Sequence, residues 1–193
     1  MIPVTDPDAV VTELLGLLVE HGRAHYDGPV NQLEHAVQCA LLAANDGAPD
    51  SLITAALLHD VGHLINGDRD GGAAQRGDDL RHEAAGAAFL RRWFASDVVA
   101  PVALHVRAKR YLVGVDPEYA GRLSLASQRS LAVQGGALAP AERAAFEGLP
   151  FANAAVKLRR WDDAAKVEGM TLPPLATYAP LLRRVTTRGA AGC

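Results

Sequence analysis

The chain has 193 residues, of which 49% are apolar and 21% are charged, and its formal net charge is −3. This length argues for one domain, and the apolar share is large enough to fill a core, which excludes a chain that is disordered throughout. The negative charge argues against a protein that coats nucleic acid.

Composition also narrows the fold class and the compartment. Aromatic residues make up only 5% of the chain, and its many Ala, Leu and Val residues favour close-packed helices over a β-sandwich. The two cysteines, Cys39 and Cys193, are too few for a disulfide framework and fit a reducing compartment. The first twenty residues lack the basic start of a secretion signal, and no apolar stretch reaches the roughly 18 residues of a membrane span. We therefore expect a cytoplasmic, all-α protein without membrane or nucleic-acid partners, and the sequence leaves its oligomeric state open.

Capping residues and apolar periodicity predict helices along the whole chain. Asp6 and Pro7 mark the start of the first helix, and Gly135-Gly136 is a typical helix stop. The predicted helices cover about residues 7–22, 30–44, 51–59, 80–94, 97–110, 122–134, a short segment from Pro140, 151–167 and 174–187, with a polar loop at 66–79 and a connector at 114–121. We expect them to form a single domain over residues 1–193.

An imidazole and a carboxylate stand together at the end of the most apolar of these helices. His59 and Asp60 follow the largely apolar run 52–58, and burying both groups is costly unless something compensates them. A metal ion is the usual compensation, because it replaces water for both groups and keeps the carboxylate ionised. Gly62 is expected to let the chain turn away and leave the pair facing a cavity. The sequence therefore predicts a metal site at His59-Asp60.

Other residues complete a ligand set of four imidazoles and two carboxylates. Its members are His35, His59, Asp60, His82, His105 and Asp162. One octahedral metal that bound all six would have no open position for a substrate. Two metals bridged by Asp60 leave several positions open, so two is the better count. Imidazole and carboxylate ligands suit iron, manganese, zinc or cobalt and do not select the element.

Donors for an anion stand at helical spacing from two of these ligands. Lys109 follows His105 by four residues and Arg159 precedes Asp162 by three, so each shares a helix face with a candidate ligand. A polar stripe on another helix consists of Ser127, Ser130 and Gln134. Any one of these is ordinarily a solvated surface residue, but the chain has only three lysines and one of them stands beside a ligand. Together the donors suit a tetrahedral dianion.

The ligand order resembles that of the dinuclear branch of the HD-domain superfamily, whose fold is a helical bundle. Within that branch the chain resembles the mixed-valent di-iron oxygenases that cleave the carbon–phosphorus bond of 1-hydroxyphosphonates. The stretches that carry the resemblance are Asn31–His35, His59–His63, His105–Leu112, Leu123–Ser127, Gln134–Gly136 and Arg159–Asp162. The resemblance covers about residues 26–166, which we take as the metal- and substrate-binding core.

This resemblance implies two iron ions, one Fe(II) and one Fe(III), held by the six ligands, with O2 as co-substrate. It implies oxidation of the carbon that bears the hydroxyl, with release of phosphate and a carboxylic acid, in organophosphonate catabolism. It assigns the phosphonate group to Lys109, Ser127, Gln134 and Arg159, and we add Ser130 and Gln32 as substrate-binding candidates. Two candidate catalytic residues follow from it: His63, beside the substrate, and Tyr26, able to cap an iron.

The loop before His35 departs from the family pattern. The family carries Tyr and then Gly-Glu, with the Glu near the substrate's amino group, whereas Pro29 follows Gly28 directly here. Either Asp27 replaces that Glu or the substrate lacks a free amine. The substrate therefore stays open among 2-amino-1-hydroxyethylphosphonate, a trimethylammonio analogue, hydroxymethylphosphonate and other 1-hydroxyphosphonates.

Other functions fit parts of the same pattern. An HD phosphohydrolase acting on a nucleotide or phosphate ester would use a metal-activated water and the same Lys and Arg. Stacking aromatics for a base would favour it, and the chain has few. A signalling module without activity often lacks ligands or anion contacts, and both sets are complete here. Inositol-oxygenase-like chemistry shares the ligands, but the anion-binding residues favour a phosphonate.

Overall fold

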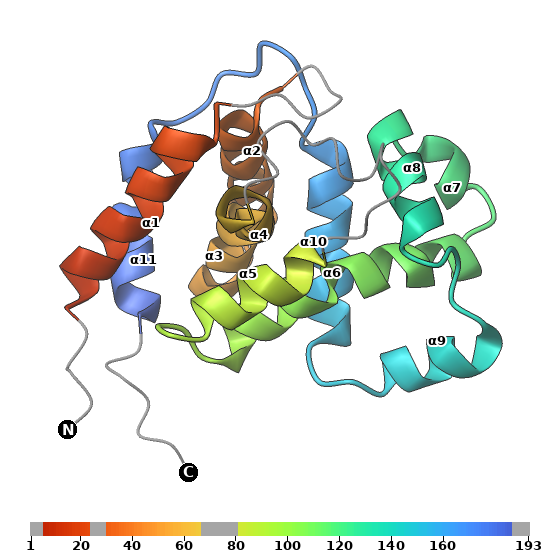
Figure 1. Ribbon diagram of the computed structural model, residues 1–193. Coiled ribbons are helices and arrows are strands. Elements are labelled where there is room, and N and C mark those ends of the chain that lie inside the picture. The colour runs from red at the N-terminus through yellow and green to blue at the C-terminus, as the bar shows by residue number, and fades with distance from the viewer. Residues whose placement is uncertain (1–5, 24–29, 67–80, 187–193) are drawn as a thin grey trace.

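The structure is a computed structural model that describes residues 6–23, 30–66 and 81–186, and every regular element within these ranges is a helix (Figure 1). The elements are α1 (Pro7–His21), α2 (Gln32–Asn45), α3 (Asp50–Leu58), α4 (Val61–Ile65), α5 (His82–Leu90), α6 (Ser96–Val115), α7 (Tyr119–Arg122), α8 (Leu125–Val133), α9 (Pro140–Glu147), α10 (Ala152–Ala164), the 3-10 helix η1 (Leu175–Tyr178) and α11 (Ala179–Val185). The predicted all-α class is confirmed. The predicted loop at 66–79 lies almost wholly outside the described residues.

Local capping fixes where the first two helices begin. The Asp6 side chain accepts a hydrogen bond from the backbone N–H of Asp8, as predicted. At the start of α2, Asn31 and Glu34 each accept a hydrogen bond from the other's backbone N–H, at 2.8 and 3.0 Å. This capping box sets the register of α2 and therefore the direction in which His35 points, one turn further on.

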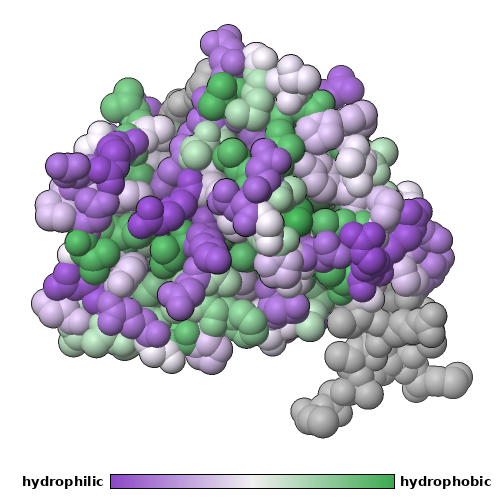
Figure 2. All heavy atoms as spheres, turned by 180° about the vertical axis from the view of Figure 1, so that it is seen from behind, coloured by the Kyte–Doolittle hydropathy of each residue, from purple (hydrophilic) through white to green (hydrophobic). Residues whose placement is uncertain are grey.

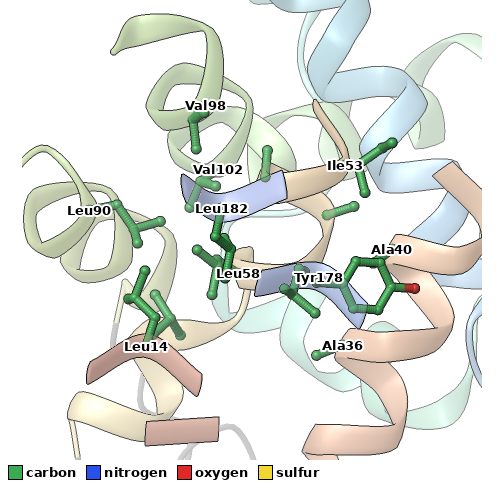
Figure 3. Packing of buried hydrophobic residues seen from close by; sticks show 14 of the residues in the cluster. Leu14, Ala36, Ala40, Ile53, Leu58, Leu90, Val98, Val102, Tyr178 and Leu182 are labelled. Carbon is green, nitrogen blue, oxygen red and sulfur yellow. The ribbon is translucent and has the colours of Figure 1, made fainter. Parts of the chain in front are cut away.

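The main core lies between α1, α2, α3, α4, α5, α6, α10 and α11. In Figure 3, Leu58 of α3 and Leu182 of α11 meet near Leu14 of α1 and Leu90 of α5, and all four are fully buried. Leu58 immediately precedes His59. The packed core therefore holds the end of α3, and with it the His59-Asp60 pair, in place.

The other end of the molecule carries α7, α8 and α9, beyond the point where α6 and α10 cross in Figure 1. Two smaller apolar clusters attach this end, one around Phe146 and one formed by Leu112, Tyr119 and Leu123. Helix α8 presents mostly polar or exposed residues, and Ser127 is its one buried side chain. Polar contacts therefore provide much of its attachment.

Two expectations about the chain path are wrong, one at Gly62 and one at the predicted connector 114–121. The chain does not turn away at Gly62, because α4 begins at Val61 and continues through this residue. A Cβ at Gly62 would lie 1.9 Å from the carbonyl oxygen of His82, so the glycine is needed for the close approach of α4 to the start of α5. The segment 114–121 is not wholly a connector, because α6 continues to Val115 and α7 begins at Tyr119. A Cβ at Gly114 would lie 3.0 Å from the Leu138 carbonyl oxygen.

Among the described residues, no helix is both long enough and apolar enough to cross a bilayer. On the face seen in Figure 2, hydrophilic and hydrophobic residues are interspersed. Exposed large apolar residues such as Leu125 and Val19 lie on separate helices, which is usual for a folded domain.

Candidate metal centre and anion pocket

Four buried imidazoles face the two oxygens of one carboxylate. Oδ2 of Asp60 lies 3.7 Å from Nε2 of His35 and 3.4 Å from Nε2 of His59. Its Oδ1 lies 3.5 Å from Nε2 of His82 and 3.7 Å from Nε2 of His105. Asp60 therefore stands between two histidine pairs, which come from α2 and the end of α3 on one side and from α5 and α6 on the other. In this position Asp60 could bridge two metal ions.

Backbone carbonyls set the tautomer of three of these rings. Nδ1 of His35 donates to the Ala165 carbonyl oxygen at 2.7 Å, and the same atom of His59 and His105 donates to the carbonyl three residues earlier, at 2.9 and 2.8 Å. A carbonyl oxygen only accepts, so Nδ1 carries the hydrogen and Nε2 of the neutral ring carries a lone pair. Such bonds orient histidine ligands in metal sites.

The Nε2 atoms lie close together in pairs. They are 3.3 Å apart in His35 and His59 and 3.1 Å apart in His82 and His105. Two lone pairs at this separation repel each other unless a cation lies between or beside them. The donor set thus fits one metal ion at each pair, with Asp60 shared.

The protonation states of these side chains agree with metal binding. Burial lowers the pKa of His105 to about 4 and that of His82 well below its usual value, so both rings are neutral and able to ligate. Burial works against the charged form of His59 too, but the Asp60 carboxylate raises its pKa to about 9. Burial also opposes ionisation of Asp60, yet His59 and the neighbouring imidazoles hold its pKa well below the usual value. A metal ion would take the place of the His59 proton.

Asp162 of α10 joins the first histidine pair. Its oxygens lie 3.3 Å from Nε2 of His35 and 3.8 Å from Nε2 of His59, and these three residues form one candidate ligand group. Two cations also contact Asp162: Nη1 of Arg159 at 2.7 Å and Nζ of Lys166 at 3.1 Å. Burial opposes ionisation, but Arg159 and Lys166 hold the Asp162 pKa well below its usual value.

A cluster of polar side chains next to this centre holds the predicted anion-binding residues. Nζ of Lys109, a residue only 2% exposed, donates to Oγ of Ser130 at 2.7 Å. Nη2 of Arg159, also buried, donates to Oγ of Ser127 at 3.3 Å. Side chains from α6, α8 and α10 therefore converge, and they offer two cationic and two hydroxyl donors.

The structure describes three of the four remaining predicted residues. Gln134 caps the end of α8, and its Oε1 is buried without a hydrogen-bond partner among the described residues. Gln32 is buried in the first turn of α2, three residues before His35. The His63 ring stacks on His82 with centroids 3.9 Å apart, and this residue groups with Asp60 and His82 as a further possible ligand set. Tyr26 lies outside the described residues.

Comparison with known proteins agrees with this geometry. The model of the HD domain matches residues 32–129, just over half of the chain. The chain belongs to the HD-domain family. The hydroxymethylphosphonate dioxygenase of Gimesia maris is 48% identical over 172 residues, which are 89% of this chain and 86% of that protein.

Two further relatives extend the comparison. The [1-hydroxy-2-(trimethylamino)ethyl]phosphonate dioxygenase (glycine-betaine-forming) of Leisingera caerulea is 37% identical over 93% of this chain and 91% of its own length. An uncharacterized protein, L432, of Acanthamoeba polyphaga mimivirus is 35% identical over 89% of this chain and 80% of its own. The chain is thus a member of the HD-domain phosphonate oxygenases, the family that its motifs resemble.

Three residues around the HD-domain site were not predicted from the sequence. Lys166 contacts Asp162, and Tyr119 and Asp163 contact Arg159. Lys166 and Asp163 stand four residues after Asp162 and Arg159, a helical spacing that could have suggested both. Tyr119 precedes Arg159 by 40 residues, and no local pattern connects them.

Proposed function

We propose that this protein is a di-iron oxygenase that uses O2 to cleave the carbon–phosphorus bond of a 1-hydroxyalkylphosphonate, releasing phosphate and a carboxylic acid. The observation that carries the proposal is the bridging position of Asp60 between two histidine pairs, with Lys109 and Arg159 close by. The identity to two phosphonate dioxygenases supports the choice of reaction within the HD-domain family.

The six predicted ligands would hold the two metals. His35, His59 and Asp162 would bind one ion, His82 and His105 would bind the other, and Asp60 would bridge them. An Fe(II)/Fe(III) pair in this position, when bound, would supply the site for O2 and the Lewis acid for the substrate oxygens. The side chains then hold the substrate in a fixed orientation and offset its charge.

The protein's own contribution to the reaction is anion binding and orientation. Lys109 and Arg159 would bind the phosphonate oxygens through charge-assisted hydrogen bonds, and the hydroxyls of Ser127 and Ser130 would complete the contacts. The side-chain NH2 of Gln134 would donate to the same anion. With the phosphonate held there, the hydroxyl-bearing carbon is directed toward the metal centre. His63, beside His82, would border the substrate.

Hydroxymethylphosphonate is the first substrate to test. The relative that acts on it shares 48% identity with this chain, against 37% for the trimethylamino-substrate enzyme. The absence of a Glu after Gly28 also agrees with a substrate that carries no amine. For this one-carbon substrate, uptake of one O2 yields one formate, one phosphate and one proton. We also place the enzyme in the cytoplasm, which the free, buried Cys39 supports.

An oxygen-uptake assay tests the proposal. The iron-loaded protein with hydroxymethylphosphonate should consume O2 and release phosphate and formate in equal amounts, and should release no phosphate without O2. An odd-electron Fe(II)/Fe(III) pair should give an electron paramagnetic resonance signal. Phosphate release from a monoester at the same rate without O2 would instead assign the protein to the HD phosphohydrolases.

A matched pair of variants links this activity to the metal centre. Asp60→Ala should lose both metal and O2 uptake. Asp50→Ala, at the start of the helix that precedes Asp60, removes an exposed ion pair with Arg184 and should keep both. Full activity of Asp60→Ala would refute the assigned centre.

A further inference from the structure

The guanidinium of Arg159 is held from one side by the next turn of its own helix. Its Nε donates to Oδ2 of Asp163 at 3.2 Å, and its Nη2 donates to Oδ1 of the same carboxylate. A carboxylate that accepts from both nitrogens fixes the plane of the guanidinium as well as its distance. The remaining contacts then point in defined directions, Nη1 to Asp162 and Nη2 to the hydroxyl of Ser127.

A tyrosine from another helix closes this arrangement. The hydroxyl of Tyr119, on α7, donates to Oδ2 of Asp163 and accepts from Nε of Arg159 at 3.2 Å. The Tyr119 ring is buried with Leu112 and Leu123. This position is fixed by packing, so the tyrosine anchors the carboxylate and the guanidinium together against the end of α6.

We propose that Asp163 and Tyr119 are positioning residues that hold Arg159 in the orientation needed to bind a tetrahedral oxyanion at Ser127. This inference rests on the proposed role of Arg159 in phosphonate binding. Neither residue needs to touch the substrate. Both act by limiting the rotation of a long side chain that would otherwise lose conformational entropy when the anion binds.

Removal of the Asp163 charge distinguishes positioning from simple electrostatics. Asp163→Asn deletes a negative charge next to the anion pocket. If only the field mattered, an anion would bind more tightly to this variant. If the carboxylate positions Arg159, the anion binds more weakly, because the amide offers one acceptor oxygen in place of two. The two explanations therefore predict changes of opposite sign.

The experiment measures the dissociation constant of inorganic phosphate by calorimetry on metal-loaded protein, with metal content and melting temperature recorded for each variant. We expect about a tenfold rise for Asp163→Asn, about threefold for Tyr119→Phe and about thirtyfold for Arg159→Gln, in line with lost or weakened hydrogen bonds to charged groups. In a protein that already carries Arg159→Gln, Asp163→Asn should raise the dissociation constant by less than about twofold. A residue that acts through Arg159 has no effect once Arg159 has been replaced. Metal content should not change.

Two control variants match these substitutions. Tyr111→Phe removes a hydrogen bond to Glu147 at the surface, and Asp116→Asn removes the exposed pair with Arg122 of α7. Neither substitution should change the dissociation constant of phosphate. Unchanged or tighter binding by both Asp163→Asn and Tyr119→Phe would overturn the inference, as would additive effects in the double variant or a wild-type protein that binds no phosphate. If Asp163→Asn and Tyr119→Phe weaken phosphate binding through Arg159 as expected, but the protein has no oxygenase activity, only the proposed function is overturned.

Discussion

At the scale of single residues, Lys109 combines deep burial with a charge that the proposed anion binding requires. Burial lowers its pKa to about 7, and the positive charge of Arg159 acts in the same direction. Its ammonium group has one neutral partner, the Ser130 hydroxyl, in the described structure. A buried cation with a neutral partner is costly, and a bound dianion would compensate it. Lys109 thus favours ligand binding at some expense of stability.

The titration of Lys109 predicts a pH dependence. Above pH 7 the free lysine loses its proton, whereas a bound dianion raises its pKa and restores the proton. Anion binding therefore takes up a proton above this pH, and affinity should fall by up to about tenfold per pH unit as pH rises through 7. Lys109→Met should lose affinity by about 10–100-fold near pH 6, keep its metal, and lack this falling limb.

Titration calorimetry of a phosphonate between pH 6 and 9 checks both statements. Lys157→Met is the matched control, because Lys157 is exposed on α10 and its loss should leave the whole profile unchanged. If the wild-type affinity does not change across this pH range, or if the affinity of Lys109→Met still falls above pH 7, Lys109 is not the titrating group.

At the scale of helices, the structure shows which boundaries a single sequence specifies. The starts of α1 and α2 follow from caps and periodicity, which are local properties of the chain. The short helices α4 and α7 contain only five and four residues, too few for an apolar period, and were not predicted. The predicted connector began at Gly114, although α6 includes this residue; the glycine lies close to the Leu138 carbonyl, which is 24 residues away in sequence and gives no local signal.

The same distinction applies to the site. The candidate centre could be proposed because the His59-Asp60 pair is unusual after an apolar helix and because imidazoles and carboxylates are themselves metal-binding groups. The groups that support Arg159 have ordinary types, and Tyr119 reaches it only through tertiary packing. Sequence therefore indicates the reacting groups more readily than the groups that orient them.

The contact between α4 and α5 gives a prediction at this scale. Gly62→Ala places a Cβ within 1.9 Å of the His82 carbonyl oxygen, a backbone atom that cannot move without displacing the start of α5. We expect a loss of about 1–3 kcal/mol or more in the free energy of unfolding and a weaker metal site at His82 and His105. Denaturant unfolding and metal analysis measure these effects.

Gly16→Ala is the control for the same change inside a helix. A Cβ at Gly16 of α1 meets nothing within 4 Å, so this substitution should stabilise the protein by about 0.5–1 kcal/mol and leave the metal unchanged. Equal stability and metal content in both variants would mean that α4 and α5 do not need their close approach.

At the scale of the whole molecule, the candidate centre joins helices that are far apart in the chain. Its ligands come from α2, the α3–α4 junction, α5, α6 and α10, and the main core includes residues from the same helices. We infer that they belong to one HD domain, since removing any one of these helices would remove a ligand and part of the core together.

Because of this connection, metal bound at the proposed centre would be part of the folding equilibrium. An ion that binds only the folded chain adds about 2.7 kcal/mol of stability at one hundred times its dissociation constant, and two ions add more. For a chain of this size each kcal/mol corresponds to about 2–4 °C in melting temperature. Chelation should therefore lower the melting temperature by about 5–20 °C, and iron should restore it. Asp60→Ala should melt at the same temperature with and without chelator, because it has no bridged centre to lose. A wild-type protein shown to contain metal, whose melting temperature does not respond to chelation, would place that metal outside these helices.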